Sequence, residues 1–472
     1  MKPRTRRAAT AAALVMTTCL AAPAPAAGCP GLRAKGAWSL ADEPYEVDVA
    51  NGANITPLTH VLGFPQESFH AGGGPGRIFL NDGVTLRRTT DKGCTWQRAY
   101  SIDPTAVTAT ASDPAVAVAI SQLQYTIIAV ATQTRPAGAS PAKGAPDPVY
   151  ILMANTDGWF TGLGQNTAGV FPYLLAHSMD GGTTWQTDLL RVRYPWAPEP
   201  VPLTGNGLTP SRATAPVLVV SATDPRTAYV VLDARDAARI AGALPAAAID
   251  GRGLYVTHDA GASWSFASAA PDDWGGLVAD PLDGNVLYVR RAGGVDMVTV
   301  GAKTVRRGLI AAVPGIDAVT GVDVEHVRGR PARILVGVGR YDAKLQRTFH
   351  LMYLSTDGGR RWLTVAVPPG GKDDTIAGGH PWLAAGGDVV LLLCVGPIGN
   401  HRVALRRWSS RTRTWGPQRA AAPPLSAGLK GLSLTGMIPA DSSHRTFLVR
   451  GLQEGPNGVS LRVVGTFDER LG

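Results

Sequence analysis

The sequence predicts an all-β fold assembled from repeated units. Long helical periodicity is nearly absent, and short Val/Ile/Leu/Tyr runs alternate with turns rich in Gly, Pro, Asp and Asn. One pattern, Ser/Thr-x-Asp-x-Gly-x-x-Trp, occurs four times, each time after a strand-like run. Its fixed positions are Asp91, Gly93 and Trp96; Asp180, Gly182 and Trp185; Asp259, Gly261 and Trp264; and Asp357, Gly359 and Trp362.

The repeated pattern has the chemistry of a β-hairpin turn. The Asp side chain can accept hydrogen bonds from the amides of its own turn. Gly adopts backbone conformations that strain other residues, and Trp can cover the turn while its indole N–H finds a carbonyl. All three residue types therefore stabilise the fold, and we assign them no catalytic role.

The N-terminus has the features of a secretory signal over residues 1–27. A positively charged start precedes an Ala-rich apolar run and a group of small residues that offer cleavage sites. The apolar run is too short to favour a membrane anchor, and no later segment is apolar enough to span a bilayer. We expect an exported protein; Arg6 and Arg7 leave the twin-arginine route open as an alternative.

The cysteines leave two alternatives open at the mature N-terminus. Cys29 follows Ala26-Ala27-Gly28, which is similar to a lipoprotein box, so Cys29 could carry a lipid. The competing prediction is a disulfide between Cys29 and Cys94, because disulfides form in exported proteins. Cys394 lies in an apolar run, and we expect an inert core thiol there.

Composition argues against several classes of function. The formal net charge is +9, but the arginines are scattered along the chain, which favours a solvated surface over a nucleic-acid site. The sequence contains no phosphate-binding Gly loop, no His/Glu metal motif and no Ser/His/Asp elbow. We therefore expect no cofactor, no metal and no nucleic-acid partner. We also expect a monomer.

Strand groups divide the chain after residue 54 into seven units. We expect these units to be the four-stranded antiparallel blades of one β-propeller over residues 55–472, with eight blades as the alternative. Within residues 28–54, the runs starting at Trp38 and Tyr45 could supply a closing strand that pairs with the last blade. The expected blades span 55–102, 107–190, 215–269, 275–312, 320–368, 382–421 and 432–472.

The repeated pattern resembles the Asp-box, or BNR repeat, of sialidases, sortilin-type propellers, xyloglucan-active glycoside hydrolases and photosystem II assembly factors. A second signature, a strand ending in Asp-Pro or Ala-Asp before a Tyr- or Phe-bearing strand, begins at Val219, Leu277 and Met437. It is similar to the sortilin and glycoside-hydrolase branch. The resemblance covers most of the mature chain and implies a propeller, but enzymes and non-enzymes share the motif. The arginine triad of sialidases is absent.

The resemblance also implies which end of the blades is functional. In Asp-box propellers the box lies between the third and fourth strands of a blade, on the face away from the active site. By count, the long loops 133–171, 194–212 and 233–252 fall on the opposite face. Their aromatic side chains and neighbouring carboxylates suit a sugar ligand, although Asp also initiates turns. The ligand-binding candidates are Trp159, Tyr194, Trp196, Arg235, Arg239, Trp274, Tyr341, His380 and Trp382.

Three functions remain in competition. The first is a non-catalytic exported propeller that binds a protein or glycan through its loop-rich face. The second is a glycoside hydrolase that uses two carboxylates on the same face as acid and base. The third is an assembly or stability factor for an exported complex. The catalytic candidates for the second are Glu199, Asp272, Asp273, Asp373 and Asp374.

Overall fold

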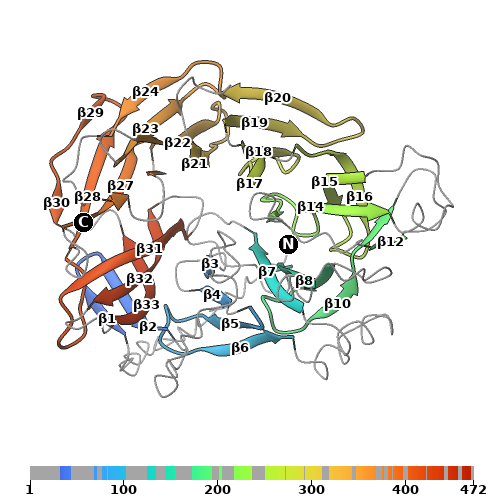
Figure 1. Ribbon diagram of the computed structural model, residues 1–472, viewed down its shortest axis with the longest axis horizontal. Coiled ribbons are helices and arrows are strands. Elements are labelled where there is room, and N and C mark those ends of the chain that lie inside the picture. The colour runs from blue at the N-terminus through green and yellow to red at the C-terminus, as the bar shows by residue number, and fades with distance from the viewer. Residues whose placement is uncertain are drawn as a thin grey trace, which may run out of the picture.

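The protein is a seven-bladed β-propeller, which confirms the fold class predicted from the sequence (Figure 1). Its strands form seven separate antiparallel-based sheets arranged as a ring. Across the described ranges, no helix has the length and apolar character needed to span a membrane. The computed structural model describes residues 32–43, 69–71, 77–81, 83–102, 125–133, 145–155, 173–193, 201–204, 217–236, 250–271, 273–291, 293–310, 318–342, 347–367, 375–376, 381–384, 386–396, 402–420, 422–440, 445–454 and 460–468.

The first three blades come from consecutive parts of the chain. Blade one contains β3 (Phe69–Ala71), β4 (Ile78–Asn81), β5 (Thr85–Thr89) and β6 (Gln97–Ser101). Blade two contains β7 (Tyr125–Thr132), β8 (Val149–Asn155), β9 (Tyr173–Ser178) and β10 (Gln186–Leu189). Blade three contains β13 (Val217–Val220), β14 (Ala228–Asp236), β15 (Asp250–Thr257) and β16 (Trp264–Ala269), and its sheet also includes β11 (Arg191–Arg193) and β12 (Val201–Thr204).

Blades four to six continue the ring. Blade four contains β17 (Trp274–Ala279), β18 (Val286–Arg291), β19 (Gly294–Thr299) and β20 (Val305–Ile310). Blade five contains β21 (Ala318–Glu325), β22 (Arg333–Asp342), β23 (Arg347–Ser355) and β24 (Leu363–Ala366). Blade six contains β25 (Thr375–Ile376), β26 (Trp382–Leu383), β27 (Val389–Val395), β28 (Arg402–Ser409), β29 (Thr414–Trp415) and β30 (Arg419–Ala420).

Blade seven joins the two ends of the chain. It contains β31 (Gly431–Pro439), β32 (Thr446–Glu454) and β33 (Ser460–Asp468), followed by β2 (Trp38–Asp42) and β1 (Arg33–Lys35) from the N-terminal segment. β2 pairs antiparallel with β33, from Trp38 opposite Phe467 to Asp42 opposite Val463. A strand from the start of the chain therefore covers the edge of the last three strands and closes the ring. The second run, which begins at Tyr45, lies outside the described residues.

The hydrophobic core is made where neighbouring blades meet. Tyr150, Leu175 and Trp264 belong to one cluster of buried side chains shared by blades two and three. Another cluster joins Tyr229 of blade three to Trp274 and Val298 of blade four. Burial of apolar side chains between sheets thus holds the blades together. Cys394 in β27 is a buried thiol, as expected, and its Sγ accepts a hydrogen bond from the backbone N–H of Leu434 in blade seven.

Each copy of the repeated pattern forms the turn between the third and fourth strands of its blade, which we call the box turn. In blade two, Ser178 Oγ donates to Asp180 Oδ1 at 2.8 Å, and Ser178 Oγ accepts the N–H of Gly182 at 2.8 Å. Asp180 Oδ1 also accepts the N–H of Thr184 at 2.8 Å. The same three bonds occur in the box turns of blades one, three and five. The predicted turn chemistry is therefore present in all four copies.

The box-turn glycines also let neighbouring blades approach closely. Gly261 has a φ of +95°, and a Cβ atom there would lie 2.7 Å from Leu175 in the preceding blade. Gly359 has a φ of +81°, and its Cβ would lie 2.9 Å from Leu309 of blade four. A larger residue would therefore be strained and would push the blades apart. This inter-blade role adds to the turn role that the sequence indicated.

The box-turn tryptophans pack as expected, but their indole groups differ. Trp264 is fully buried, and the other three lie against the core clusters of their blades. The Nε1 of Trp185 donates to the carbonyl of Gly182 at 3.2 Å. Within the described residues, the indole nitrogens of Trp96, Trp264 and Trp362 have no hydrogen-bond partner. The tryptophans therefore act mainly through packing.

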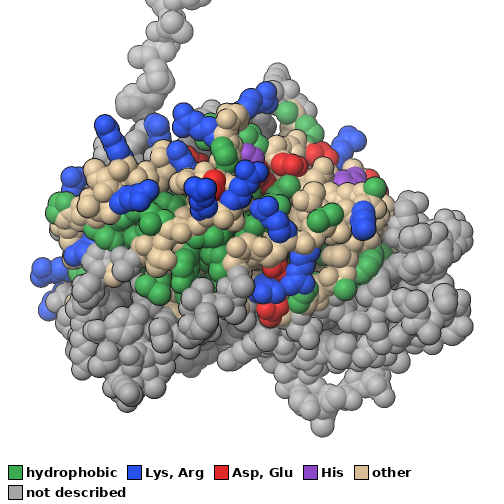
Figure 2. Space-filling view, turned by 90° about the horizontal axis from the view of Figure 1, so that it is seen from above, with side chains coloured by type: hydrophobic (Ala, Val, Ile, Leu, Met, Phe, Trp, Pro, Cys, Tyr) green, Lys and Arg blue, Asp and Glu red, His purple; other side chains and the backbone are tan. Residues whose placement is uncertain are grey.

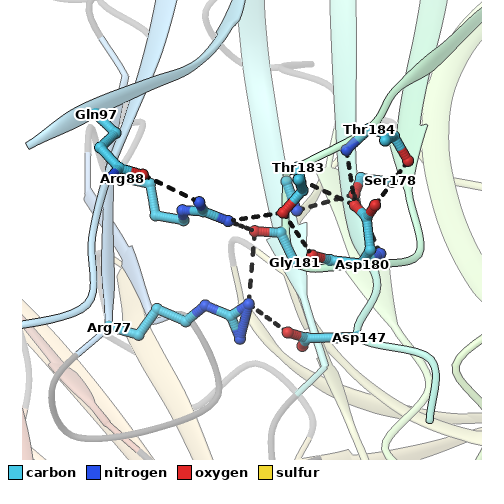
Figure 3. Close-up of polar contacts among 10 residues, drawn as sticks. Arg77, Arg88, Gln97, Asp147, Ser178, Asp180, Gly181, Thr183 and Thr184 are labelled. Carbon is cyan, nitrogen blue, oxygen red and sulfur yellow. Dashed lines mark hydrogen bonds and ion pairs between the residues drawn. The ribbon is translucent and has the colours of Figure 1, made fainter. Parts of the chain in front are cut away.

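The surface is rich in basic side chains. Figure 2 shows many Lys and Arg side chains and few Asp and Glu on the side of the molecule that lies uppermost in Figure 1. Some of these arginines have structural roles between blades. In blade one, Arg88 donates to the carbonyl of Gly181 in the next box turn, and Arg77 pairs with Asp147 beside that turn (Figure 3). Arg307 of blade four donates in the same way to the carbonyl of Gly358, at 3.0 Å.

Tyr229, from the second signature, also makes a contact between neighbouring blades. Asp224 and Asp280 of this signature lie in the turns between the first and second strands of blades three and four, and Asp441 lies outside the described residues. Tyr229 in β14 donates to the carbonyl of Gly284 in the blade-four turn at 2.7 Å. Burial, together with Asp283 and Asp224, raises the pKa of Tyr229 to about 12, so the hydroxyl remains a donor at neutral pH.

Two expected loops have a different course in the structure. We expected residues 133–171 to be one loop between the second and third strands of blade two, but β8 lies within this range and is itself the second strand. Asp147, just before β8, bridges to Asp180 at the box-turn end of the blade. Residues 156–172 lie outside the described residues. The apolar run 149–155 lies between two Pro/Gly-rich segments, and for this reason the sequence analysis included it in a loop.

The second corrected loop is 194–212. Its residues Val201–Thr204 form β12, which pairs with β11 and, through Leu203 and Thr204, with β14. Blade six is also longer at its start than expected, because Thr375 and Ile376 pair with β27 before Trp382 is reached. In both cases, a short strand pairs with longer strands of a sheet, and the sequence indicated only the longer ones.

Candidate functional site

The described part of the predicted functional face lies at the end of the blades opposite the box turns, which we call the loop end. Arg235, near the end of β14, pairs with Asp250 in the hairpin between the second and third strands of blade three. Tyr341, near the end of β22, pairs with Thr348 in the corresponding hairpin of blade five. Asp273 and Trp274 stand between them, where the chain enters blade four. Predicted site residues from three consecutive blades therefore share one end.

For Arg235 and Tyr341 the structure describes the backbone only. Lying outside the described residues are Trp159, Tyr194, Trp196, Glu199, Arg239, Asp272, Asp373, Asp374 and His380.

Asp273 is the one catalytic candidate that the structure describes. A turn closed by the N–H of Trp274 and the carbonyl of Pro271, at 3.1 Å, precedes β17 and carries Asp273 at the blade end. Its side chain is 39% exposed, and its Oδ2 lies 3.9 Å from Nε of Arg291. Asp273 is thus a partly exposed carboxylate close to a cationic side chain.

The centre of the cluster is Asp296, a carboxylate that sequence analysis missed. It lies in β19, and its side chain is 2% exposed. Nε of Arg306 in β20 donates to its Oδ2 at 2.6 Å, and Nε of Arg291 lies 3.5 Å from its Oδ1. The indole N–H of Trp274 donates to the same Oδ2 at 3.3 Å. Two guanidinium groups and one indole therefore compensate a buried negative charge.

Arg291 links the buried and the exposed carboxylates. It ends β18, its side chain is 25% exposed, and it lies between Asp273 and Asp296. Arg306 is 40% exposed, and its guanidinium carbon lies 5.6 Å from the centre of the Trp274 ring. The surface of this cluster therefore offers a carboxylate and two guanidinium groups, which can bind hydroxyl or carboxylate groups of a ligand.

Two predicted ligand-stacking residues are core residues instead. Trp274 is 1% exposed and packs in the cluster between blades three and four. Trp382 is 7% exposed, and the N–H of the adjacent Leu383 donates to the buried Asp323 at 2.8 Å. Neither ring presents a face to a ligand, so we reassign both to packing. Each follows Asp or Pro in the sequence, which made a strand start resemble a loop.

The cluster has no evident metal-binding chemistry. Among the described residues, no group of three or more His, Cys, Asp or Glu side chains could hold a metal ion. Asp296, the carboxylate that shares Arg291 with Asp273, is engaged by two arginines and an indole. A signal for Asp296 did exist in the sequence, because it is a lone acid in the otherwise apolar and small strand Gly294–Thr299.

Comparison with known proteins adds fold-level likeness only. No protein-family model and no curated protein matches the chain. Among solved structures, a prolyl endopeptidase is 12% identical, with a TM-score of 0.39, over 93% of this chain and 60% of that chain. A GH74 enzyme of Niastella koreensis is 12% identical, with a TM-score of 0.24, over 84% of this chain and 62% of that chain. The polysaccharide lyase Uly1 is 11% identical, with a TM-score of 0.41, over 84% of this chain and 90% of that chain.

The chain therefore spans less than two thirds of the length of the first two of these structures.

Proposed function

We propose that this protein is an exported propeller that binds a protein or carbohydrate ligand at its loop end without catalysing a reaction. The observation that carries the proposal is the placement of Arg235, Asp273 and Tyr341, from blades three, four and five, at one end. The box turns occupy the other end and are committed to hydrogen bonds within the fold. Loops at one end of a rigid scaffold are where binding residues concentrate.

Among the described residues, the geometry around Asp273 supports binding over hydrolysis. A glycoside hydrolase needs two carboxylates that flank the bond to be cleaved, one as acid and one as base or nucleophile. Asp296 is buried behind Arg291 and Arg306, so it does not offer Asp273 such a partner. Asp273 with the two arginines instead forms a polar surface suited to hydrogen bonds with sugar hydroxyls or polar side chains.

Export and the state of Cys29 belong to the same proposal. A signal over residues 1–27 would deliver the propeller to an oxidising compartment, where Cys29 could pair with Cys94. Cys94 lies in the box turn of blade one, next to β2 of the closing segment. A Cys29–Cys94 bond would fasten the mature N-terminus to that blade.

A glycan array and a panel of extracellular proteins, probed with purified protein, test the proposal. For any ligand found, Trp159→Ala or Trp196→Ala should weaken binding by about 1–3 kcal/mol. Lys92→Gln, an exposed substitution in the box turn of blade one, should leave affinity unchanged. Equal affinity in all four proteins would place the site elsewhere. Turnover of a bound glycan that Asp273→Asn or Asp373→Asn abolishes, while binding persists, would identify the hydrolase instead.

A further inference from the structure

A patch of exposed apolar and basic side chains lies at the box-turn end of blades four and five. Among the described residues, the exposed large hydrophobic side chains are Val84, Leu282, Val305 and Val327, and the last three belong to this patch. Single exposed apolar side chains are common, but a group of them indicates an interaction surface. We define the apolar–basic patch as Leu282, Lys303, Val305, Val327, Arg328 and Arg330.

Hydrogen bonds join the turns that carry the patch. The turn at 280–285 contacts the turn at 300–304 through the N–H of Val300 and the carbonyl of Asn285, at 2.8 Å. It also contacts blade five, because Nδ1 of His326 lies 2.7 Å from Oδ1 of the buried Asp280. The three segments are therefore neighbours on one surface, although they are separated in sequence.

The exposed side chains are held in place by tight turns. Asp280 Oδ1 accepts the N–H groups of Leu282 and Asp283 at 2.8 and 2.9 Å. The N–H of Arg330 donates to the carbonyl of Val327 at 3.0 Å, and Gly329 between them has a φ of +79°. Leu282 and Val327 are 40% and 49% exposed on these turns, so the fold itself holds two aliphatic side chains in solvent.

The charge around these aliphatic side chains is positive. Lys303, Arg328 and Arg330 are exposed, and Arg360 and Arg361 are exposed on the box turn of blade five. Asp283 is an exposed acid in the patch, where it accepts the N–H of Asn285, and Asp280 is buried against His326. Figure 2 shows basic side chains interspersed with hydrophobic ones on the side of the molecule that carries these blades.

We propose that the apolar–basic patch binds an anionic lipid surface. Aliphatic side chains on turns can enter the boundary between headgroups and acyl chains, while neighbouring Lys and Arg attract anionic headgroups. An acidic protein would satisfy the charges, but it would need a pocket for each of three separate aliphatic side chains. A bilayer accepts them without such complementarity. Bound in this way, the propeller directs its loop end away from the lipid.

Vesicle cosedimentation of the full chain tests this proposal. Vesicles of phosphatidylcholine mixed with phosphatidylglycerol should bind the protein, and vesicles of phosphatidylcholine alone should bind it far less. Arg328→Gln with Arg330→Gln should weaken binding on the order of 30-fold, because each basic side chain near an anionic surface contributes about fivefold. Leu282→Asn with Val327→Asn should also weaken it, and high salt should release the wild-type protein.

The matched control is Val84→Asn with Arg402→Gln, which alters one exposed aliphatic and one exposed basic residue at the loop end. These changes should leave vesicle binding intact, and any contribution from residues 1–31 is common to all variants. Thermal unfolding confirms that each variant is folded. Equal binding to both vesicle types, or equal losses in the patch and control variants, overturns the proposal. Binding to polyglutamate without binding to anionic vesicles also overturns it and assigns the patch to an acidic protein.

Discussion

Glu43 and Arg450 form a buried ion pair between residues that are 407 positions apart in the sequence. Nη2 of Arg450 donates to Oε2 of Glu43 at 2.9 Å, and its Nε donates to Oε1, so the contact is bidentate. The side chains are 1% and 8% exposed for Glu43 and Arg450. Glu43 directly follows β2, and Arg450 lies in the middle of β32. The pair therefore ties the closing strand to the interior of blade seven.

Removing one partner of this ion pair should destabilise the protein. Glu43→Gln leaves Arg450 buried without its counter-charge, and we expect the free energy of unfolding to fall by about 3–5 kcal/mol. Urea unfolding of wild type and variant measures the change. Arg33→Gln is the control, because Arg33 and Asp42 pair at 2.6 Å in the same segment but Asp42 is 45% exposed. That exposed pair should contribute less than about 1 kcal/mol. Equal losses would mean that burial does not set the energy of the Glu43 pair.

The box turns should make stability depend on acid pH. In Asp180, burial raises the pKa, but hydrogen bonds from Thr184, Ser178 and Thr183 outweigh it and hold the pKa below 3.8. Folding therefore favours the ionised form, so this stabilisation is complete above about pH 4 and is lost as pH falls through the folded pKa. The pKa values of Asp91, Asp259 and Asp357 are lowered by the same kind of turn bonds.

Thermal unfolding of wild type and Asp180→Asn, followed from pH 6 down to about pH 2.5, measures this dependence. The variant should be less stable at pH 6, and the difference between the two proteins should shrink as the pH falls. A difference that stays constant across this range would show that the charge of Asp180 has no part in the turn.

Substituting two adjacent glycines in the box turn of blade five should distinguish the cost of backbone strain from the cost of a clash with the neighbouring blade. Gly358 and Gly359 both have positive φ, +73° and +81°, so Ala is strained at either position. A Cβ at Gly358 would have no atom within 4 Å, whereas a Cβ at Gly359 would lie 2.9 Å from Leu309 of blade four. Gly358→Ala should cost about 1–2 kcal/mol, and Gly359→Ala about 1–3 kcal/mol more. Denaturant unfolding compares them, and equal costs would argue against a packing role for Gly359.

Local chemistry made the fold predictable. The box turns depend on residues within eight positions of one another, and so the sequence pattern is enough to place a hairpin at Asp91, Asp180, Asp259 and Asp357. The Asp-Pro turns are equally local, as the bonds around Asp224 and Asp280 illustrate. Short edge strands such as Val201–Thr204 depend on partners supplied by distant strands, and their sequences carry little signal of their own.

The candidate site was harder to predict, because it depends on contacts across strands. Asp296 is neutralised by Arg291 and Arg306, which lie on the strands at either side of β19, and only the sheet register brings them together. The sequence predicted Trp274 to be an exposed loop residue, whereas in the structure it is buried at the start of β17, with the guanidinium of Arg306 over its ring. A periodic pattern reports which residues are buried, but it does not report which charges meet across strands.

The two acids of the cluster on blade four should contribute differently to stability, because Asp296 is buried and Asp273 is partly exposed. Asp296→Asn removes the charge that Arg306 and Arg291 face inside the sheet, and we expect a loss of about 3 kcal/mol in the free energy of unfolding. Asp273→Asn alters a side chain that is 39% exposed and 3.9 Å from Arg291, so stability should change by less than about 1 kcal/mol. Chemical denaturation measures both losses. Each variant carries the same near-isosteric change from Asp to Asn, so the two losses can be compared directly. A large loss for Asp273→Asn would place it in the scaffold and remove it from the surface that we propose binds the ligand.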